Sequence, residues 1–229
     1  MEKGRRVWRW MALGLVVLLG LSWWAVKWEP SFYSGAEQLN RNDERVRKLS
    51  KKFIQNLMQF NDELQNEETF EAVFGEEEIN AWLADEWERK YRQLLPPGFS
   101  RPRLHFAPEG AEAACQIEVG PLRFVANGAV RVFPTEDDRL AIAVDALRLG
   151  RLPLPATDLL EPLVNQLQQD RRGVEWRQMD GVDVLVMDPF DLADDDDRKR
   201  SATERRLQVV QMGQGELRLK GVQVPRNSD

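Results

Sequence analysis

The sequence has one cysteine and one histidine among its 229 residues. Cys115 alone cannot form an internal disulfide, and its presence assigns no redox compartment. A catalytic triad or a histidine-based metal site would have to use His105, which lies between Leu104 and Phe106 in an alternating segment and is expected to be a solvated strand histidine. The HExxH, CxxC, GxSxG and glycine-rich phosphate-binding motifs are also absent. An enzyme is therefore the least favoured interpretation, and we expect no catalytic residue, metal or cofactor.

Positive charge is scarce outside the N-terminus. The formal net charge is −6; Glu2 against five Lys and Arg side chains leaves residues 1–28 at +4, so residues 29–229 carry −10. An acidic domain repels phosphate backbones, which argues against a nucleic-acid partner. With 42% hydrophobic residues, the chain is long enough for one core and an accessory helix.

One long hydrophobic run is present, WMALGLVVLLGLSWWAV from Trp10 to Val26, and it contains no charged residue. As a helix these residues cover roughly 25 Å, near the lower limit for crossing a bilayer core. Tryptophans at both ends suit the two aromatic belts of a membrane. A signal-peptide cleavage site requires small residues at positions −3 and −1, and this region offers Trp23, Trp24 and Trp28 instead. We expect residues 1–28 to be a cytoplasmic tail and a single-pass transmembrane anchor in the cell membrane. The Lys and Arg excess before the run places the N-terminus in the cytoplasm and the bulk of the chain outside it.

Residues 29–67 are predicted to be a connector followed by an amphipathic helix over 36–66. Its apolar stripe consists of Leu39, Val46, Phe53 and Phe60 at seven-residue spacing, with Leu49, Leu57 and Leu64 between them. Two interpretations stay open. The stripe packs on the chain's own domain, which we favour, or it forms a short coiled coil with another copy or a membrane-protein partner.

Residues 68–229 are predicted to form an extracytoplasmic α+β domain. It begins with a short strand, ETFEAVF, and a helix, GEEEINAWLADEWERKYRQLL. Glu76, Glu77 and Glu78 suit the positive end of that helix dipole, and adjacent helix positions point in different directions, so a metal site there is disfavoured. Further strands are expected at VDVLVMD, RRLQVVQM and ELRLKGVQV.

After LPPGFSRP the hydrophobic period changes from 3.6 to 2, which predicts an antiparallel meander with one apolar face. The alternation slips at DALRLG, where Leu147 and Leu149 follow an even-numbered run, and this slip predicts a β-bulge or a bend. Pro153 and Pro155 then end the strand, and Thr157 or Asp158 can cap a leucine-rich helix that we expect on the apolar face. The predicted fold is an N-terminal transmembrane helix, then a curved antiparallel β-meander covered by amphipathic helices.

The combination of an anchor, FGEEEINAWLA, a meander and LGRLPLP before a leucine-rich helix resembles the YpmS-like family of small membrane-anchored bacterial proteins. The resemblance covers about residues 68–170 and rests on Ile79 and Asn80 in the first motif and on Gly150 to Pro155 in the second. It implies a distant likeness to tubular lipid-binding domains, in which a curved sheet and a helix enclose an apolar groove. The helix 36–66 and an acidic loop depart from the family pattern.

We therefore expect a membrane-anchored, extracytoplasmic binding module that holds a lipid or another apolar ligand between sheet and helices. The predicted lining of the groove is Ile79, Trp82, Leu83, Phe106, Ile117, Phe124, Val130, Ile142, Leu160 and Leu163. The alternative is a non-enzymatic scaffold or adaptor of the cell envelope that associates through helix 36–66. The acidic run from Asp191 to Asp197 lacks the glycine and glutamate of an EF-hand loop and is expected to be solvated, although Ca²⁺ binding stays open.

Overall fold

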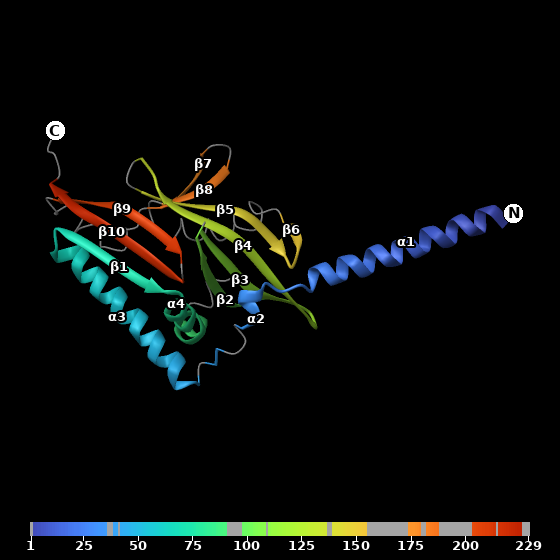
Figure 1. Cartoon of the computed structure of the whole chain (residues 1–229), viewed down its shortest axis with the longest axis horizontal. Coiled ribbons are helices and arrows are strands. Elements are labelled where there is room, and N and C mark those ends of the chain that lie inside the picture. The colour runs from blue at the N-terminus through green and yellow to red at the C-terminus, as the bar shows by residue number, and fades with distance from the viewer. Residues whose placement is uncertain are drawn as a thin grey trace.

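The computed structural model describes residues 2–35, 39–40, 42–90, 98–108, 110–136, 139–154, 174–179, 182–187, 203–213 and 215–225. Its helices are α1 (Glu2–Val26), α2 (Ser31–Ser34), α3 (Glu44–Asn66), α4 (Glu76–Trp82) and α5 (Glu88–Lys90), with a π-helical turn η2 (Leu83–Trp87) between the last two. Its strands are β1 (Thr69–Gly75), β2 (Phe99–Ala107), β3 (Gly110–Val119), β4 (Leu122–Pro134), β5 (Leu140–Leu149), β6 (Leu152–Leu154), β7 (Glu175–Met179), β8 (Val182–Met187), β9 (Thr203–Gly213) and β10 (Glu216–Pro225). The chain is thus α+β, as the sequence predicts, and its strands pair antiparallel (Figure 1).

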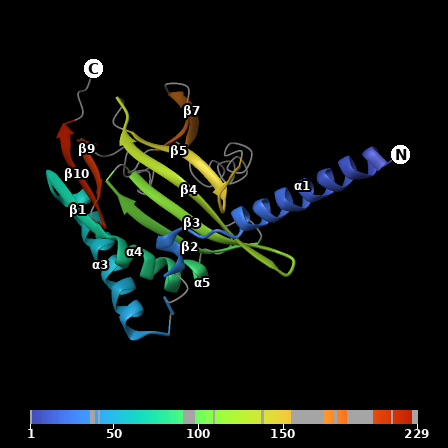
Figure 2. The ribbon, with the colours of Figure 1, turned by 45° about the vertical axis from the view of Figure 1, so that its right-hand side comes forward.

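Helix α1 projects away from the rest of the chain (Figures 1 and 2). Its side chains are described at Met11 and from Leu13 to Val26, and most of the apolar ones are exposed: Met11 by 67% and Leu18 by 62%. Over the described residues, no helix is long and apolar enough to cross a membrane.

The predicted meander is confirmed as strands β2 to β5 of a seven-stranded sheet with the order β2-β3-β4-β5-β8-β7 and β6 beside β5. Its register is regular between β3 and β4, where Ile117 pairs with Phe124. Between β4 and β5 the register shifts, because Ala129 pairs with Ala146 but Val130 pairs with Val144. Asp145 is the extra residue, so the predicted bulge is confirmed, and it keeps Leu147 on the same face as Val144.

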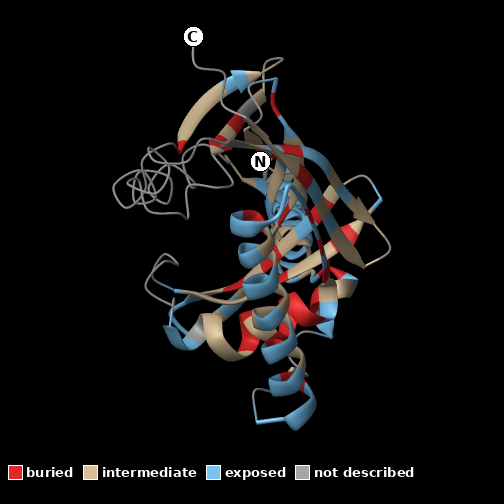
Figure 3. Ribbon diagram, turned by 90° about the vertical axis from the view of Figure 1, so that its left-hand side faces the viewer, coloured by how far each residue is buried: buried red, intermediate tan, exposed pale blue. Residues whose placement is uncertain are grey.

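A second, three-stranded sheet has the order β1-β10-β9 and joins an early strand to the last strand of the chain. The sequence predicts these strands but not that they form a separate sheet, and it does not predict β7. Helix α3 packs against β1 and α4. This sheet and the two helices lie at one end of the seven-stranded sheet (Figure 1), where Phe74, Ile79, Leu83 and Phe106 form a buried cluster. Figure 3 colours the ribbon by burial and shows the buried segments in red.

The predicted boundaries of three segments need correction. Helix α3 begins at Glu44 rather than at residue 36, because the carboxylate of Asp43 caps the helix by accepting the backbone N–H of Arg45 at 2.9 Å. The predicted connector contains the helical turn α2, which buries Tyr33. The helix after β1 is not α-helical throughout, since η2 interrupts it at Leu83.

Candidate functional site

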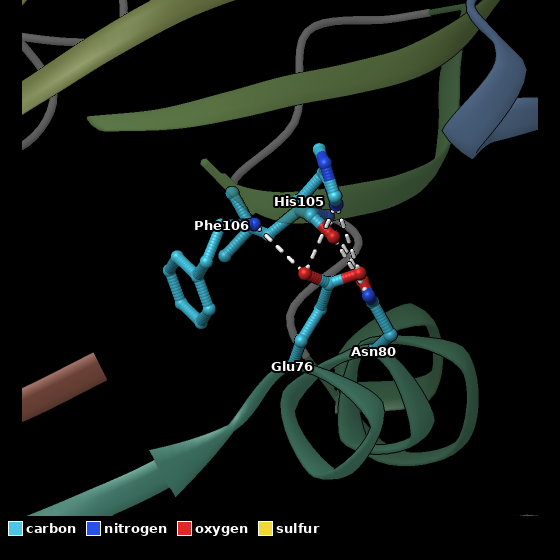
Figure 4. Close-up of polar contacts among 5 residues, drawn as sticks. Glu76, Asn80, His105 and Phe106 are labelled. Carbon is cyan, nitrogen blue, oxygen red and sulfur yellow. Dashed lines mark hydrogen bonds and ion pairs between the residues drawn. The ribbon is translucent and has the colours of Figure 1, made fainter. Parts of the chain in front are cut away.

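Helix α4 is fastened to the free edge of strand β2 by two side chains one helical turn apart (Figure 4). The side-chain amide of Asn80 donates to the carbonyl of Leu104 at 2.7 Å and accepts its N–H at 2.9 Å. The carboxylate of Glu76 accepts the N–H of Phe106 at 2.8 Å. These bonds pair backbone N–H and C=O groups that would lack a hydrogen-bond partner on an edge strand. Asn80 of the FGEEEINAWLA motif therefore has a structural role.

The three glutamates that begin α4 have three different partners, as their adjacent helix positions predict. Glu76 binds the edge of β2, and Glu77 forms an exposed ion pair with Arg45 at 3.1 Å. Glu78 is 8% exposed and contacts the ammonium of Lys52 and the amide of Asn56, both from α3. The three glutamates therefore hold α4 against strand β2 and helix α3, and their carboxylates do not form a common site.

His105 lies on the opposite side of β2 from Leu104 and Phe106. Its ring stacks on Phe32 of α2 with centroids 5.5 Å apart, and its Nδ1 lies 3.1 Å from a carboxylate oxygen of Glu76. The side chain is 40% exposed, so the predicted solvated histidine in fact has two partners and joins α2 to α4.

One face of the seven-stranded sheet carries almost entirely apolar side chains. The register places on this face Leu104, Phe106, Ala111, Ala113, Cys115, Ile117, Phe124, Ala126, Val130, Val132, Ile142, Val144, Leu147, Leu149 and Leu185, which we call the apolar face. The opposite side of the same strands carries His105, Glu112, Arg131 and Asp145. It also carries buried apolar side chains, namely Ala114, Val125, Ala141, Ala143, Val184 and Val186.

The middle of the apolar face consists of small residues. Ala113 and Cys115 on β3 lie opposite Gly128 and Ala126 on β4. Ala126 and Gly128 are buried, whereas Ala113 and Cys115 are intermediate in exposure, as are Ile117, Phe124, Val130, Ile142, Val144, Leu147 and Leu149. Burial raises the pKa of the Cys115 thiol to about 12, as expected for an apolar surrounding. The surface is therefore apolar, and most of its larger side chains are half-buried.

The predicted groove residues divide between two parts of this face. Ile79 and Leu83 pack with Phe106 in one buried cluster, and Trp82 lies against it. The rings of Phe53 and Phe74 contact each other at a tilt on that side, so this end is a filled core rather than an open groove. The half-buried middle of the face carries Ile117, Phe124, Val130 and Ile142. Leu160 and Leu163 lie outside the described residues.

The other end of the apolar face meets the C-terminal end of α1. The rings of Trp23 and Phe124 contact each other edge to face with centroids 6.4 Å apart. The N–H of Arg151 donates to the carbonyl of Ala25 at 2.9 Å, in the turn between β5 and β6. Gly150 has a φ of +60°, and a Cβ there would lie 2.3 Å from the Ala25 carbonyl oxygen. Glycine at this position therefore allows α1 to rest on the turn.

Sequence reasoning missed two parts of this arrangement. Leu147 and Leu149 extend the apolar face beyond the bulge, and the alternation across that bulge contains the signal that could have placed them there. The contact between Trp23 and Phe124 has no local signal, because it joins residues that are distant in sequence.

The apolar stripe of α3 packs mainly on the chain itself, as the favoured interpretation predicts. Phe53 and Phe60 contact the core beside Phe74, Leu64 is buried against Phe70, and Val46 is buried against α4 and η2. Leu57 remains 41% exposed. Association of α3 with a partner would have to use the side that carries Leu57.

Metal binding has no candidate in the described part of the chain, where no three His, Cys, Asp or Glu side chains are grouped to hold an ion. The acidic run from Asp191 to Asp197 lies outside the described residues. Comparison of the chain with protein-family models, with curated proteins and with solved structures finds no match.

Proposed function

We propose that this chain is a membrane-anchored binding module that holds a lipid or another apolar ligand on the apolar face of its seven-stranded sheet. In this proposal α1 spans the cell membrane, and the curved sheet with its covering helices lies outside the cytoplasm. The observation that carries the proposal is the contact between Trp23 and Phe124, because it joins the exposed apolar surface of α1 directly to the half-buried apolar face.

The exposure of α1 supports the membrane anchor. Its side chains from Leu13 to Trp24 are apolar almost throughout, and those of Leu13, Leu15, Val16, Val17, Leu18, Leu19 and Leu21 are each more than half exposed. An apolar helix surface of this extent is unfavourable in water and favourable in hydrocarbon. The uncharged run continues to Trp10, and the helix itself continues to Glu2.

The composition of the apolar face supports an acyl chain as ligand. The small side chains at Ala113, Cys115 and Ala126 lie side by side on β3 and β4, next to the larger side chains of Ile117 and Phe124. Each methylene that leaves water on such a surface contributes about 0.8 kcal/mol. A chain of ordinary length therefore gains enough to be held without any specific polar contact.

Native mass spectrometry of the full chain, extracted from membranes in mild detergent, tests this function. The variant Ala113→Trp places a bulky ring on the apolar face. Its matched control is Ala129→Trp, because Ala129 is also half-buried and lies on the neighbouring strand but faces the other way. We expect a stoichiometric lipid on the wild type and on the control.

In Ala113→Trp the amount of retained lipid should fall at least about tenfold. The ring displaces part of the acyl chain, and losing the contact of only two methylenes already lowers the affinity by about that factor. Circular dichroism shows whether each variant is folded. Equal retention by the two folded variants would exclude the apolar face as the binding surface.

A further inference from the structure

Three cationic residues lie at the end of α1, beside the apolar face. They are Lys27, Arg123 and Arg151, all of them exposed, and we call them the basic collar. The Lys27 ammonium donates to the carbonyl of Arg123 at 3.1 Å, which joins the end of α1 to β4. The N–H of Arg151 donates to the carbonyl of Ala25 at 2.9 Å. The collar is therefore built from the residue that follows α1, from β4 and from the turn after β5.

The charge of the collar is poorly neutralised within the chain. Among the described residues, the carboxylate that pairs with it is Glu118, which lies 3.5 Å from Arg123, with both side chains at least half exposed. Arg131, by contrast, forms a close two-bond pair with Asp145 on the same sheet. Residues 29–229 carry a net charge of −10, so Lys27, Arg123 and Arg151 around one weakly held carboxylate form a positive site on an acidic domain.

Tryptophan rings lie among these cations. The guanidinium of Arg151 lies 5.1 Å from the ring centre of Trp24 and 4.8 Å from that of Trp28. The Lys27 ammonium lies 5.6 Å from the ring centre of Trp23 and 5.4 Å from that of Phe124. Tryptophan beside Lys and Arg is the composition that proteins present at the depth of lipid headgroups. Phe124 belongs to both surfaces, since its ring contacts the collar and its strand position is on the apolar face.

We propose that the basic collar binds the phosphate headgroup of an anionic phospholipid whose acyl chain lies on the apolar face. This inference rests on the proposed function and gives the ligand class, an anionic rather than a zwitterionic phospholipid. Exposed Lys and Arg side chains attract anionic headgroups, and each contributes about fivefold in affinity near an anionic surface. The headgroup remains at the membrane surface while the chain enters the sheet beyond Phe124.

The test uses the full chain reconstituted in vesicles of equal phosphatidylcholine and phosphatidylglycerol, re-extracted in mild detergent and weighed by native mass spectrometry. The collar variant is Lys27→Gln with Arg151→Gln. Its control is Lys48→Gln with Lys51→Gln, which removes the same charge from exposed positions on α3, far from α1 in Figure 1. A third variant, Lys27→Arg with Arg151→Lys, keeps the charge.

We expect the wild type to retain phosphatidylglycerol over phosphatidylcholine, and the collar variant to lose at least about tenfold of that preference, given about fivefold for each cation. The control and the lysine variant should keep it. A preference that survives in the collar variant overturns the inference, as does equal loss of both lipids, which would show that the collar only supports the structure. Equal retention of both lipids by the wild type overturns the headgroup inference alone, whereas no retained lipid overturns the proposed function.

Discussion

Asn80 uses both ends of one amide to replace a missing neighbouring strand. Its oxygen and nitrogen pair with the N–H and the carbonyl of Leu104, which lies on the edge strand β2. The side chain is 8% exposed, so neither backbone group can exchange this partner for bulk water at low cost. An asparagine at this position thereby protects the sheet edge from pairing with another chain.

The variant Asn80→Ala should lower the free energy of unfolding by about 2–4 kcal/mol, because two shielded backbone groups lose their partner. Urea unfolding of the full chain in mild detergent, followed by tryptophan fluorescence, measures this change. Glu77→Ala is the control on the same helix, since its ion pair with Arg45 is exposed and contributes little. A loss no larger than that of the control would show that Asn80 does not hold the strand edge.

Single residues of the site were predictable to different degrees. Alternation places Ile117 and Phe124 on one face because the two-residue period of a strand is a local property. The same alternation cannot show that Phe106 is buried in a filled cluster whereas Ile117 is half-buried, because both environments require an apolar residue. The partners of Glu76 and His105 depend on how α4 meets β2, and no sequence spacing records that contact.

Most elements have boundaries that their own residues determine. The slip at DALRLG predicted the bulge at Asp145 because it changes which positions face the core. The start of α3 was predicted too early because apolar spacing was extended to Leu39, although Asp43 is a good capping residue. The pairing of β1 with β10 was not predictable, since alternation identifies a strand but not a distant partner.

The turn between β5 and β6 determines how α1 meets the sheet, and Gly150 is the residue that permits it. Gly150→Ala should detach the end of α1, because the added Cβ would lie 2.3 Å from the carbonyl oxygen of Ala25. Chymotrypsin should then cut the variant within residues 28–35 faster than it cuts the wild type. The rate should rise at least about threefold if the detached and attached states become similarly populated.

Gly120→Ala is a matched control for this prediction. Gly120 has nearly the same conformation, with a φ of +59°, but no atom lies within 4 Å of an added Cβ. Both variants therefore carry the same backbone strain, and only the first meets α1. Equal cleavage rates in the two variants would show that the contact with α1 does not restrain this segment.

At the scale of the whole molecule, charge and hydrophobicity are arranged along one direction. The exposed apolar helix α1 leads into the basic collar, the collar adjoins the half-buried apolar face, and the face ends at the filled core beneath α3 and α4. The net negative charge of residues 29–229 disfavours the binding of phosphate groups elsewhere on the domain. Under the proposed function, a membrane lipid would enter beside Trp23.

The central claim is that a lipid contacts the middle of the apolar face, and photocrosslinking in intact membranes tests it most directly. A benzophenone amino acid replaces Ile117 in the full chain, or Glu112 on the other face of the same strand as the control. The account predicts that irradiation adds the mass of a lipid to the chain at position 117 and not at position 112. Crosslinking at 117 only to the chain itself, or equal lipid adducts at both positions, would contradict it.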